Sequence, residues 1–507
     1  FGVNAGNSIA SGGNYNVVIG DEAGTAITTG DSNTFVGYAA GDAITGVSNI
    51  TAVGYAALSA NTSGTNGVAV GKDALQANTE GHNNTAVGLE ALQTNTTGDA
   101  NTAVGTGSLA SATTADNNTA VGRSALTANT TGASNVSVGT GALTANTTAA
   151  NNTAVGTSAL AANTTGASNV SVGTSALAAN TTAANNTAVG YTALTTNTTG
   201  AQNVAIGRDA LLGNTTGADN TAVGVGSLGA NTTASNNTAV GRLALAANTT
   251  GTDNTAVGRS SGAAITTGLY NTLIGGLAGD ALTDADENVA VGQSALTTDT
   301  KGNRNVAVGQ IALATQNFTT STDSYNTGVG YAAGSAVTTG IQNTLIGALA
   351  GDALSDADYN VAVGSQALSS DTLGSRSVAV GQSALFTQNF TTATNAYNTA
   401  VGMSAGAAVT TATNNTFIGG LSGDAATTGA SNTFVGQNSG GATTTGGQNT
   451  AVGEGALASN TTAGTNTALG RDAMYNNTTG ANNVAIGFSA MKAQTTAAGN
   501  FAAGYKA

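Results

Sequence analysis

The chain of 507 residues contains no cysteine, no proline and no tryptophan, and its single histidine is His82. Without cysteine, disulfides and cysteine-ligated metal sites are excluded. The absence of proline suits a chain whose backbone N–H groups are nearly all needed as donors in hydrogen-bonded ladders. Only 7% of the residues are charged, and the formal net charge is −14. Nucleic-acid binding is not expected, because phosphate contacts need clustered Lys and Arg.

The sequence also lacks the residue sets that enzymes and membrane spans require. Acid–base or nucleophilic catalysis needs a His or Cys beside a carboxylate, and His82 has no evident partner. The 73 glycines include no Gly-Lys-Ser/Thr phosphate loop. No apolar run approaches the roughly 20 residues of a membrane helix. We expect no enzyme and no membrane insertion in this segment, and the start at Phe1 without Met suggests a processed chain or a piece of a longer one.

What the chain does contain is one short repeat, which ends in a glycine. This glycine recurs at every seventeenth position from Gly20 to Gly309, and two steps that are longer by four positions lead to Gly330 and to Gly402. The regular step fills the rest of the chain as far as Gly504 and gives 29 copies. A period this short, held over a whole chain, predicts a solenoid in which each repeat is one turn. The representative copy used below comprises Asn84, Thr85, Ala86, Val87 and Gly88.

The five-residue repeat predicts a short strand with two apolar faces. Val87 and Thr85 share one face, which we expect to point into the turn's own interior, and Ala86 lies on the other. An outer face that stays apolar through so many turns predicts packing against a symmetry mate, with Ala86 toward the neighbouring chain. In the second half of the turn, Leu92 is expected to fill the interior from the opposite wall. That half is either a second strand or a single helical turn.

Longer periods divide the chain without breaking the repeat. Regular turns cover residues 1–258, 72-residue blocks recur within 259–417, and regular turns return in 418–507. Each block contains one 21-residue turn, and insertions in a solenoid bulge out at a corner. We therefore expect one continuous solenoid over 1–507.

The repeats resemble those of known fibrous proteins over almost the whole chain. Asn-Thr-Ala-Val-Gly at 84–88 and Asn-Val-Ala-Ile-Gly at 203–207 resemble the head repeats of trimeric autotransporter adhesins. The longer unit ending in Asn-Thr-Thr-Gly is similar to the repetitive shafts of related phage tail fibres. The resemblance implies a left-handed parallel β-roll and an elongated, extracellular homotrimer on a cell surface or virion, used for attachment. At about 4.8 Å per turn, the repeats would make a rod on the order of 140 Å long.

Two sets of residues are candidates for binding. The 21-residue turns carry aromatic residues suited to contact a host glycan or protein; the alternative is that these residues anchor the loops. Carboxylates at alternate positions, as in calcium loops, make Ca²⁺ the candidate metal, although such groups are commonly only solvated. The aromatic candidates are Phe318, Tyr325, Phe390 and Tyr397, and the carboxylate candidates are Asp284, Asp286, Asp356 and Asp358.

Two further functions are weighed against attachment. Asn95 and Asn129 begin Asn-x-Thr sequences that match the glycosylation acceptor, although stacking gives Asn and Thr a structural reason to recur. A flat Thr/Asn-rich face could instead bind ice or another surface. That alternative is disfavoured by the expectation that the strand Thr points inward and that the paired Thr96 and Thr97 lie in a turn.

Overall fold

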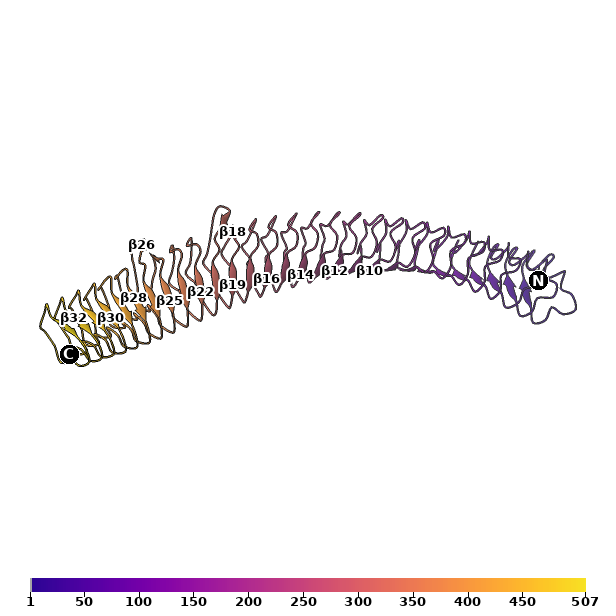
Figure 1. Ribbon diagram of the computed structural model, residues 1–507. Coiled ribbons are helices and arrows are strands. Elements are labelled where there is room, and N and C mark those ends of the chain that lie inside the picture. The colour runs from indigo at the N-terminus through magenta and orange to yellow at the C-terminus, as the bar shows by residue number, and fades with distance from the viewer. Residues whose placement is uncertain (1) are drawn as a thin grey trace. The chain divides into compact units, whose positions relative to one another are not determined.

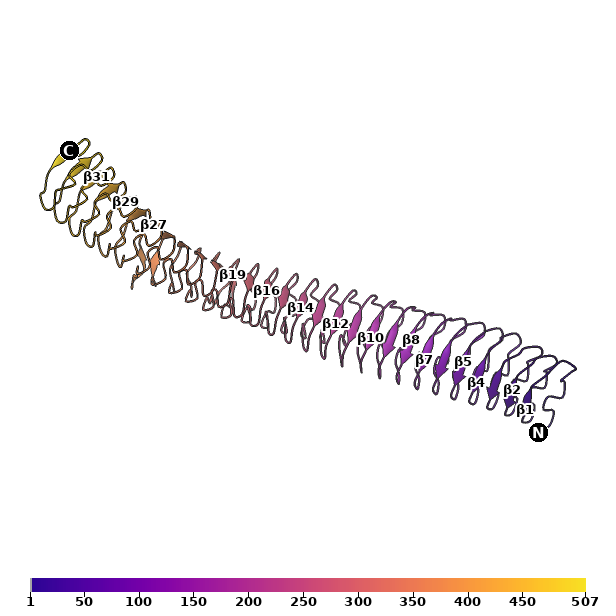
Figure 2. The same ribbon diagram turned by 90° about the horizontal axis from the view of Figure 1, so that it is seen from below.

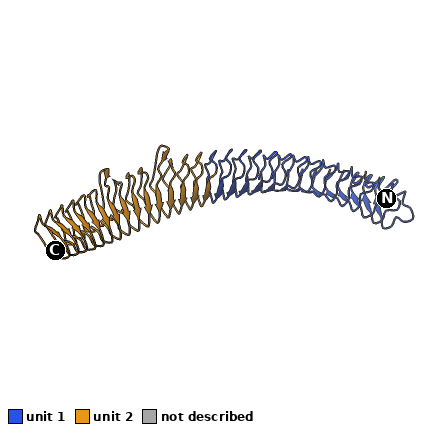
Figure 3. Ribbon diagram, viewed as in Figure 1, with its two compact units in different colours: residues 1–252 blue, residues 253–507 orange. Residues whose placement is uncertain are grey.

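The structure is a computed structural model, and it describes residues 2–507. It divides into two compact units, of which one ends at Thr252 and the other spans Asp253–Ala507 (Figure 3). In each unit the chain winds into a parallel β-solenoid, and the described residues form no helix. Taken together, the units contain 29 three-residue strands of one repeating type. The predicted all-β solenoid, with one turn for each seventeen-residue repeat, is therefore confirmed.

Each turn of the first unit contributes one strand of three residues. In Figures 1 and 2 these strands follow one another in chain order along one side of the stack. The strands are β1 (Val17–Ile19), β2 (Thr34–Val36), β3 (Thr51–Val53), β4 (Val68–Val70), β5 (Thr85–Val87), β6 (Thr102–Val104), β7 (Thr119–Val121), β8 (Val136–Val138), β9 (Thr153–Val155), β10 (Val170–Val172), β11 (Thr187–Val189), β12 (Val204–Ile206), β13 (Thr221–Val223) and β14 (Thr238–Val240).

The second unit follows the same plan and adds four strands of two residues. The three-residue strands are β15 (Thr255–Val257), β16 (Thr272–Ile274), β17 (Val289–Val291), β19 (Val306–Val308), β21 (Thr327–Val329), β22 (Thr344–Ile346), β23 (Val361–Val363), β25 (Val378–Val380), β27 (Thr399–Val401), β28 (Thr416–Ile418), β29 (Thr433–Val435), β30 (Thr450–Val452), β31 (Thr467–Leu469), β32 (Val484–Ile486) and β33 (Phe501–Ala503). The added strands are β18 (Gly302–Asn303), β20 (Thr322–Asp323), β24 (Gly374–Ser375) and β26 (Thr394–Asn395).

Strand register follows the sequence period within each unit. Thr85 pairs with Thr102 and Val87 with Val104, so each residue lies beside its equivalent in the next repeat. At the long turns the offset grows by four positions, and Val306 pairs with Thr327 without loss of register. The four inserted residues are therefore accommodated outside the main sheet, as expected for an insertion at a corner.

The two faces of the strand are the reverse of the prediction. Ala86 is completely buried, whereas Thr85 and Val87 on either side of it are half-exposed. The prediction that Thr85 and Val87 point into the turn and Ala86 toward another chain is therefore wrong. Ala86 faces the interior because the opposite wall already supplies bulk: Leu92, as predicted, is completely buried.

Several turns show directly that the middle strand residue faces this wall. Phe35 takes the place of alanine in β2, and Gly41, six residues later, takes the place of leucine. A Cβ atom on Gly41 would lie 2.8 Å from the Phe35 ring carbon Cδ1. Likewise, a Cβ atom on Gly279 would lie 2.8 Å from Cδ2 of Leu273. The interior thus has a fixed volume, which either wall can fill but not both.

Outside the two long-turn regions, the second half of a turn is neither a strand nor a helix. Glu90 and Leu92 have φ angles of 57° and 51°, so the chain reverses its local direction through left-handed residues. Left-handed backbone costs a non-glycine residue roughly 1 kcal/mol or more. Burial of Leu92 offsets this cost, because a fully buried leucine side chain contributes about 1.5–3 kcal/mol.

Asparagine side chains join successive turns inside the corners. The Asn84 Oδ1 atom accepts the backbone N–H of Asn101 at 2.9 Å, and its Nδ2 donates to the Gly98 carbonyl at 2.7 Å. In a second column, Asn95 Nδ2 donates to Asn78 Oδ1 at 2.8 Å. These amides are completely buried or nearly so, and the ladders supply most of the hydrogen bonds that burial requires. The Oδ1 atom of Asn95 has no partner, because Ala112 takes the place of asparagine in the next turn. Successive turns are thus joined by amide ladders as well as by strand pairing.

Candidate functional site

The two 21-residue turns depart most from the repeat, and both lie in the second unit. They project from the stack where Figure 1 labels β18 and β26. In the first, Gly302 and Asn303 pair in parallel with Thr322 and Asp323; in the second, β24 pairs with β26 in the same way. Each projection is thus a short, hydrogen-bonded layer beside the main sheet.

The phenylalanines of these turns lie inside them. Phe318 is 7% exposed and Phe390 is 5% exposed, so neither ring is available to a ligand. The interpretation of Phe318 and Phe390 as contact residues is corrected accordingly: they anchor the projecting loops. Tyr325 and Tyr397, by contrast, are 48% and 53% exposed and remain candidates for contact.

A buried carboxylate holds each projecting loop in place. Asp371 is completely buried, and its Oδ1 accepts the backbone N–H groups of Gly374 and Phe390, each at 3.0 Å. Gln388 Nε2 donates to Oδ2 at 2.6 Å. Asp299, in the turn before the first long turn, makes the same contacts, and its Oδ2 accepts Gln316 Nε2 at 2.6 Å. Such a carboxylate is stabilised by charge-assisted hydrogen bonds instead of by a cation.

These two aspartates are not among the residues predicted from the sequence, although the sequence contains a signal for them. Asp299 and Asp371 occupy the column that Asn95 occupies in regular turns, seven residues after the repeat glycine. An aspartate in a column of asparagines indicates a position at which the surrounding groups are hydrogen-bond donors. An asparagine there would place the N–H groups of its own amide against these donors.

Replacing Asp371 with alanine is expected to loosen the second projecting loop. Three buried donors would lose their acceptor, and each unsatisfied donor costs about 1–3 kcal/mol. We expect local stability to fall by at least about 3 kcal/mol, and amide hydrogen exchange at Phe390 to accelerate correspondingly. As a control, Asp356→Ala removes an exposed contact with the Thr339 hydroxyl and should change stability by less than about 0.5 kcal/mol. Unchanged exchange at Phe390 would show that the carboxylate does not hold the loop.

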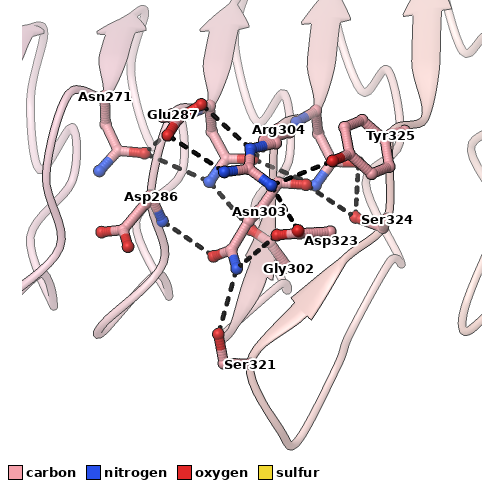
Figure 4. Close-up of polar contacts among 12 residues, drawn as sticks. Asn271, Asp286, Glu287, Gly302, Asn303, Arg304, Ser321, Asp323, Ser324 and Tyr325 are labelled. Atoms are coloured by element: carbon pink, nitrogen blue, oxygen red, sulfur yellow. Dashed lines mark hydrogen bonds and ion pairs between the residues drawn. The ribbon is translucent and has the colours of Figure 1, made fainter.

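Beside the first projecting loop, an arginine joins three turns. Figure 4 shows Arg304 between Glu287 and the pair formed by Asp323 and Tyr325. Its Nε atom lies 3.1 Å from Glu287 Oε2, and its Nη1 atom donates to the Tyr325 hydroxyl at 3.0 Å and to Asp323 Oδ2. The hydrogen bond with Glu287, then that with Tyr325 and the charge of Asp323, raise the pKa of the guanidinium above its usual value.

The corresponding residues of the second loop have a different composition. The Arg376 Cζ atom lies 5.1 Å from the centroid of the Tyr359 ring and 5.9 Å from that of Tyr397. Its Nη1 atom donates to Asn395 Oδ1. All four side chains belong to exposed residues. We call these four residues, Tyr359, Arg376, Asn395 and Tyr397, the second-loop cluster.

The four aspartates considered for calcium are already engaged with the protein. Asp286 Oδ1 accepts the N–H of Leu269 at 2.8 Å, and Asp358 Oδ1 accepts that of Ile341 at 2.9 Å. Asp356 Oδ1 accepts the Thr339 hydroxyl at 2.7 Å. Within residues 2–507, no three His, Cys, Asp or Glu side chains converge as a metal site would require. Among the described residues, none of the four candidate aspartates therefore has the further carboxylate ligands that a calcium site would need.

Asp284, the remaining candidate, has its own partners. Partial burial acts to raise the pKa of its carboxyl. The hydrogen bond from the Thr283 hydroxyl at 2.9 Å and the Lys301 ammonium 3.4 Å away outweigh burial, so the pKa lies below its usual value. Asp284 therefore remains charged through an ion pair at the surface.

A second surface of interest runs along the strands themselves. We define the outward stripe of a unit as the first and third residues of its three-residue strands; in β9 these are Thr153 and Val155. Val155 and Val172 are each 36% exposed, and Ile206 is 40% exposed. One apolar or β-branched side chain thus follows another, turn after turn, on a face that a single chain leaves half-covered.

The remaining sequence candidates lie elsewhere. Asn95 and Asn129, the glycosylation candidates, are completely buried in the amide ladders. The part of the chain that the structure describes contains no helix suited to crossing a membrane. No protein-family model matches the chain, and no curated protein sequence matches it.

Proposed function

We propose that the chain is a structural segment of an extracellular fibre, in which stacked turns space a receptor-binding tip from a virion or cell surface. The supporting observation is the repeat of one turn in unbroken register within each unit, through two insertions of four residues in the second. Stability in such a stack grows with the number of neighbouring turns, so length is obtained by repetition alone. The role is structural and needs no catalytic residue or cofactor.

We further propose that the fibre is a homotrimer held together by the outward stripe. Half-exposed Val and Ile side chains, repeated on nearly every turn, form the kind of long apolar face that soluble monomers rarely leave uncovered. The corrected strand faces change which residues would meet at the shared axis. They are Val155 and its equivalents, with the Thr or Val two positions earlier, in place of Ala86.

Charges on the outward stripe are expected to prevent assembly. The triple variant Val138→Asp, Val155→Asp and Val172→Asp places carboxylates on three consecutive turns of the stripe, where desolvation would be costly. We expect the wild-type chain to sediment as a trimer and the variant as a monomer with unchanged β circular dichroism. The matched control, Thr131→Asp, Thr148→Asp and Thr165→Asp, changes an exposed corner of the same turns and should remain trimeric. A monomeric wild-type chain at micromolar concentration would exclude the proposed assembly.

Ice binding is the second candidate, and the structure removes one objection to it. Thr85 and Val87 both point outward, so a regular Thr-x-Val array is available on each unit. However, Val replaces Thr in many strands, among them Val136, Val170 and Val204, which favours apolar burial over ordered water. The two proposals exclude each other, because trimerisation would cover the same face. Thermal hysteresis in a monomeric sample would favour ice binding.

A further inference from the structure

The two long-turn regions are copies related by the 72-residue period, and the buried residues that hold their loops are the same. Asp299, Gln316 and Phe318 in the first copy correspond to Asp371, Gln388 and Phe390 in the second. They make equivalent contacts: the aspartate accepts the phenylalanine N–H at 3.1 Å in the first copy and 3.0 Å in the second. The loops are therefore supported in the same way, and a comparison of their surfaces is a comparison of side chains on one scaffold.

The exposed parts differ at two positions beside the shared arginine. Where the first copy has Glu287, the second has Tyr359, and where the first has Asp323, the second has Asn395. Arg304 and Arg376 are retained, as are Tyr325 and Tyr397. Two carboxylates in contact with a guanidinium have thus been replaced by an aromatic ring and an amide, which changes the formal charge at these two positions by two.

In the first copy the protein itself supplies what the guanidinium binds. Arg304 Nε lies 3.1 Å from a Glu287 carboxylate oxygen, and Nη1 forms an ion pair with Asp323. Carboxylates are the preferred partners of arginine, because the planar fork of N–H groups matches their geometry. The first copy therefore shows that this location on the scaffold accommodates carboxylates on the turns before and after the arginine.

In the second copy the same guanidinium is left without an anion. Among residues 2–507 no carboxylate forms an ion pair with Arg376, and no side chain accepts a hydrogen bond from its Nε or Nη2. The nearby Asp358 uses Oδ1 to accept the Ile341 N–H. Two tyrosine rings, 42% and 53% exposed, flank the cation, and the Asn395 amide lies beside it.

We propose that the second-loop cluster binds an acidic saccharide, a pyranose ring that carries a carboxylate. Arg376 binds the carboxylate through its free N–H groups, in the manner that Arg304 binds Glu287. Tyr359 and Tyr397 offer apolar ring surface to the sugar and hydroxyl groups to its polar edge. Asn395 both donates and accepts, which suits sugar hydroxyls.

The surroundings distinguish this ligand from other anions. A nucleic acid would require several cations along its path, and this cluster has one. A free inorganic anion would make no use of two flanking rings. A single cation between aromatic side chains instead suits a ligand with one charge and a largely uncharged body. The inference deepens the proposed attachment function, since it assigns recognition to the shaft as well as to a tip, but its geometry does not depend on trimer formation.

The test uses the full-length protein with 3′-sialyllactose and hexagalacturonate as acidic probes, and with lactose and maltohexaose as neutral counterparts. Binding is measured by isothermal titration calorimetry and by saturation-transfer NMR. We expect at least one acidic probe to bind about tenfold or more tightly than its neutral counterpart. Arg376→Gln should weaken this binding at least about tenfold, because the exposed substitution removes the charge and leaves the buried support intact.

The internal copy supplies two matched variants. Tyr359→Glu with Asn395→Asp gives the second copy the two carboxylates of the first. These carboxylates should pair with the Arg376 guanidinium and abolish binding of the acidic probe. Glu287→Tyr with Asp323→Asn removes both carboxylates from the Arg304 guanidinium and should raise the binding stoichiometry from one site to two per chain. Arg304→Gln should leave binding unchanged. Circular dichroism and sedimentation of each variant separate a binding defect from a defect in folding or assembly.

Several outcomes would overturn the assignment. They are no binding of either acidic probe up to about 10 mM, undiminished binding by Arg376→Gln, and equal displacement by inorganic phosphate or by tetraglutamate. The fibre proposal would survive all three, since it is judged by sedimentation of the wild-type chain. A monomeric chain that still binds the acidic probe would reject the fibre and retain the site.

Discussion

Substitution of Gly139 with alanine is expected to disrupt the first unit at that turn. Gly139 has a φ angle of 135°, a conformation essentially reserved for glycine, and the strain alone costs about 1–3 kcal/mol. An added Cβ atom would also lie 2.5 Å from the carbonyl oxygen of Gly156 in the next turn. Because that oxygen belongs to backbone, the turns must separate to relieve the overlap. We expect a loss of at least about 3 kcal/mol in the free energy of unfolding.

The same turn offers a control that isolates the cause. Gly141 has a φ angle of 65°, and equivalent positions in neighbouring turns are occupied by Ser124 and Ser158 at 56° and 55°. A Cβ atom there would have Thr144 Oγ1 as its nearest neighbour, at 3.3 Å. Gly141→Ala should therefore cost only about 1–2 kcal/mol, the cost of the left-handed backbone alone. Urea denaturation followed by circular dichroism measures both variants, and equal losses would refute the close-approach explanation.

Deletion of one whole turn is expected to leave the first unit folded. Removal of residues 136–152 joins Asn135 to Thr153, so that the shortened chain again reads Asn-Thr-Ala-Val-Gly and both amide ladders continue in register. Each turn of a solenoid contacts only its neighbours, so the loss is that of one interface among many. We expect the melting temperature to change by only a few degrees.

Deletion of half a turn should have the opposite result. Removal of residues 136–144 eliminates β8 but retains the turn segment that follows, which places the polar Asn146 where the sheet requires a strand. The ladders on either side would be offset, and their buried amides would lose their partners. We expect loss of cooperative unfolding and rapid hydrogen exchange through the neighbouring turns. If the whole-turn deletion also prevents folding, the turns are not quasi-independent and the model of additive turns is wrong.

The fold was predictable because its main determinant is a period. A glycine at every seventeenth position fixes the register of every strand, and the pairing of Thr85 with Thr102 is the direct result. The contacts between turns did not have to be predicted separately, because each turn contacts only neighbouring copies of the same repeat. The insertions were likewise readable, because the period resumes unchanged after Gly330.

The orientation of the strand was not predicted, although the sequence contains the information. Val is larger and more apolar than Ala, which favours burial of Val87 when a strand is considered alone. The opposing wall decides otherwise, because Leu92 already fills the space. The exchange of Ala and Leu for Phe35 and Gly41 in one turn shows that the two positions share a volume. That pairing could have been found by comparing turns with one another.

The candidate site was only half predictable, for a different reason. Tyr325 and Tyr397 are exposed as expected, but the burial of Phe318 and Phe390 depends on the acceptors Asp299 and Asp371 in the preceding turns. Left-handed backbone at Leu92 was similarly hidden, since no propensity scale favours leucine in that conformation. Both features are set by contacts between turns, which a reading of local segments does not contain.

The hydrogen bonds that join successive turns also have a mechanical meaning. Strand pairing and the amide ladders through Asn84 and Asn95 both connect one turn to the next, so a pull along a stack loads them in the direction of their length. Under such tension we expect a unit to open from its end, one turn after another, because each turn contacts only its neighbours. Each regular turn that opens releases one repeat, or at most about 60 Å of extended chain. We therefore expect a stack of this kind to lengthen in equal steps under tension, and each step leaves the remaining turns in register.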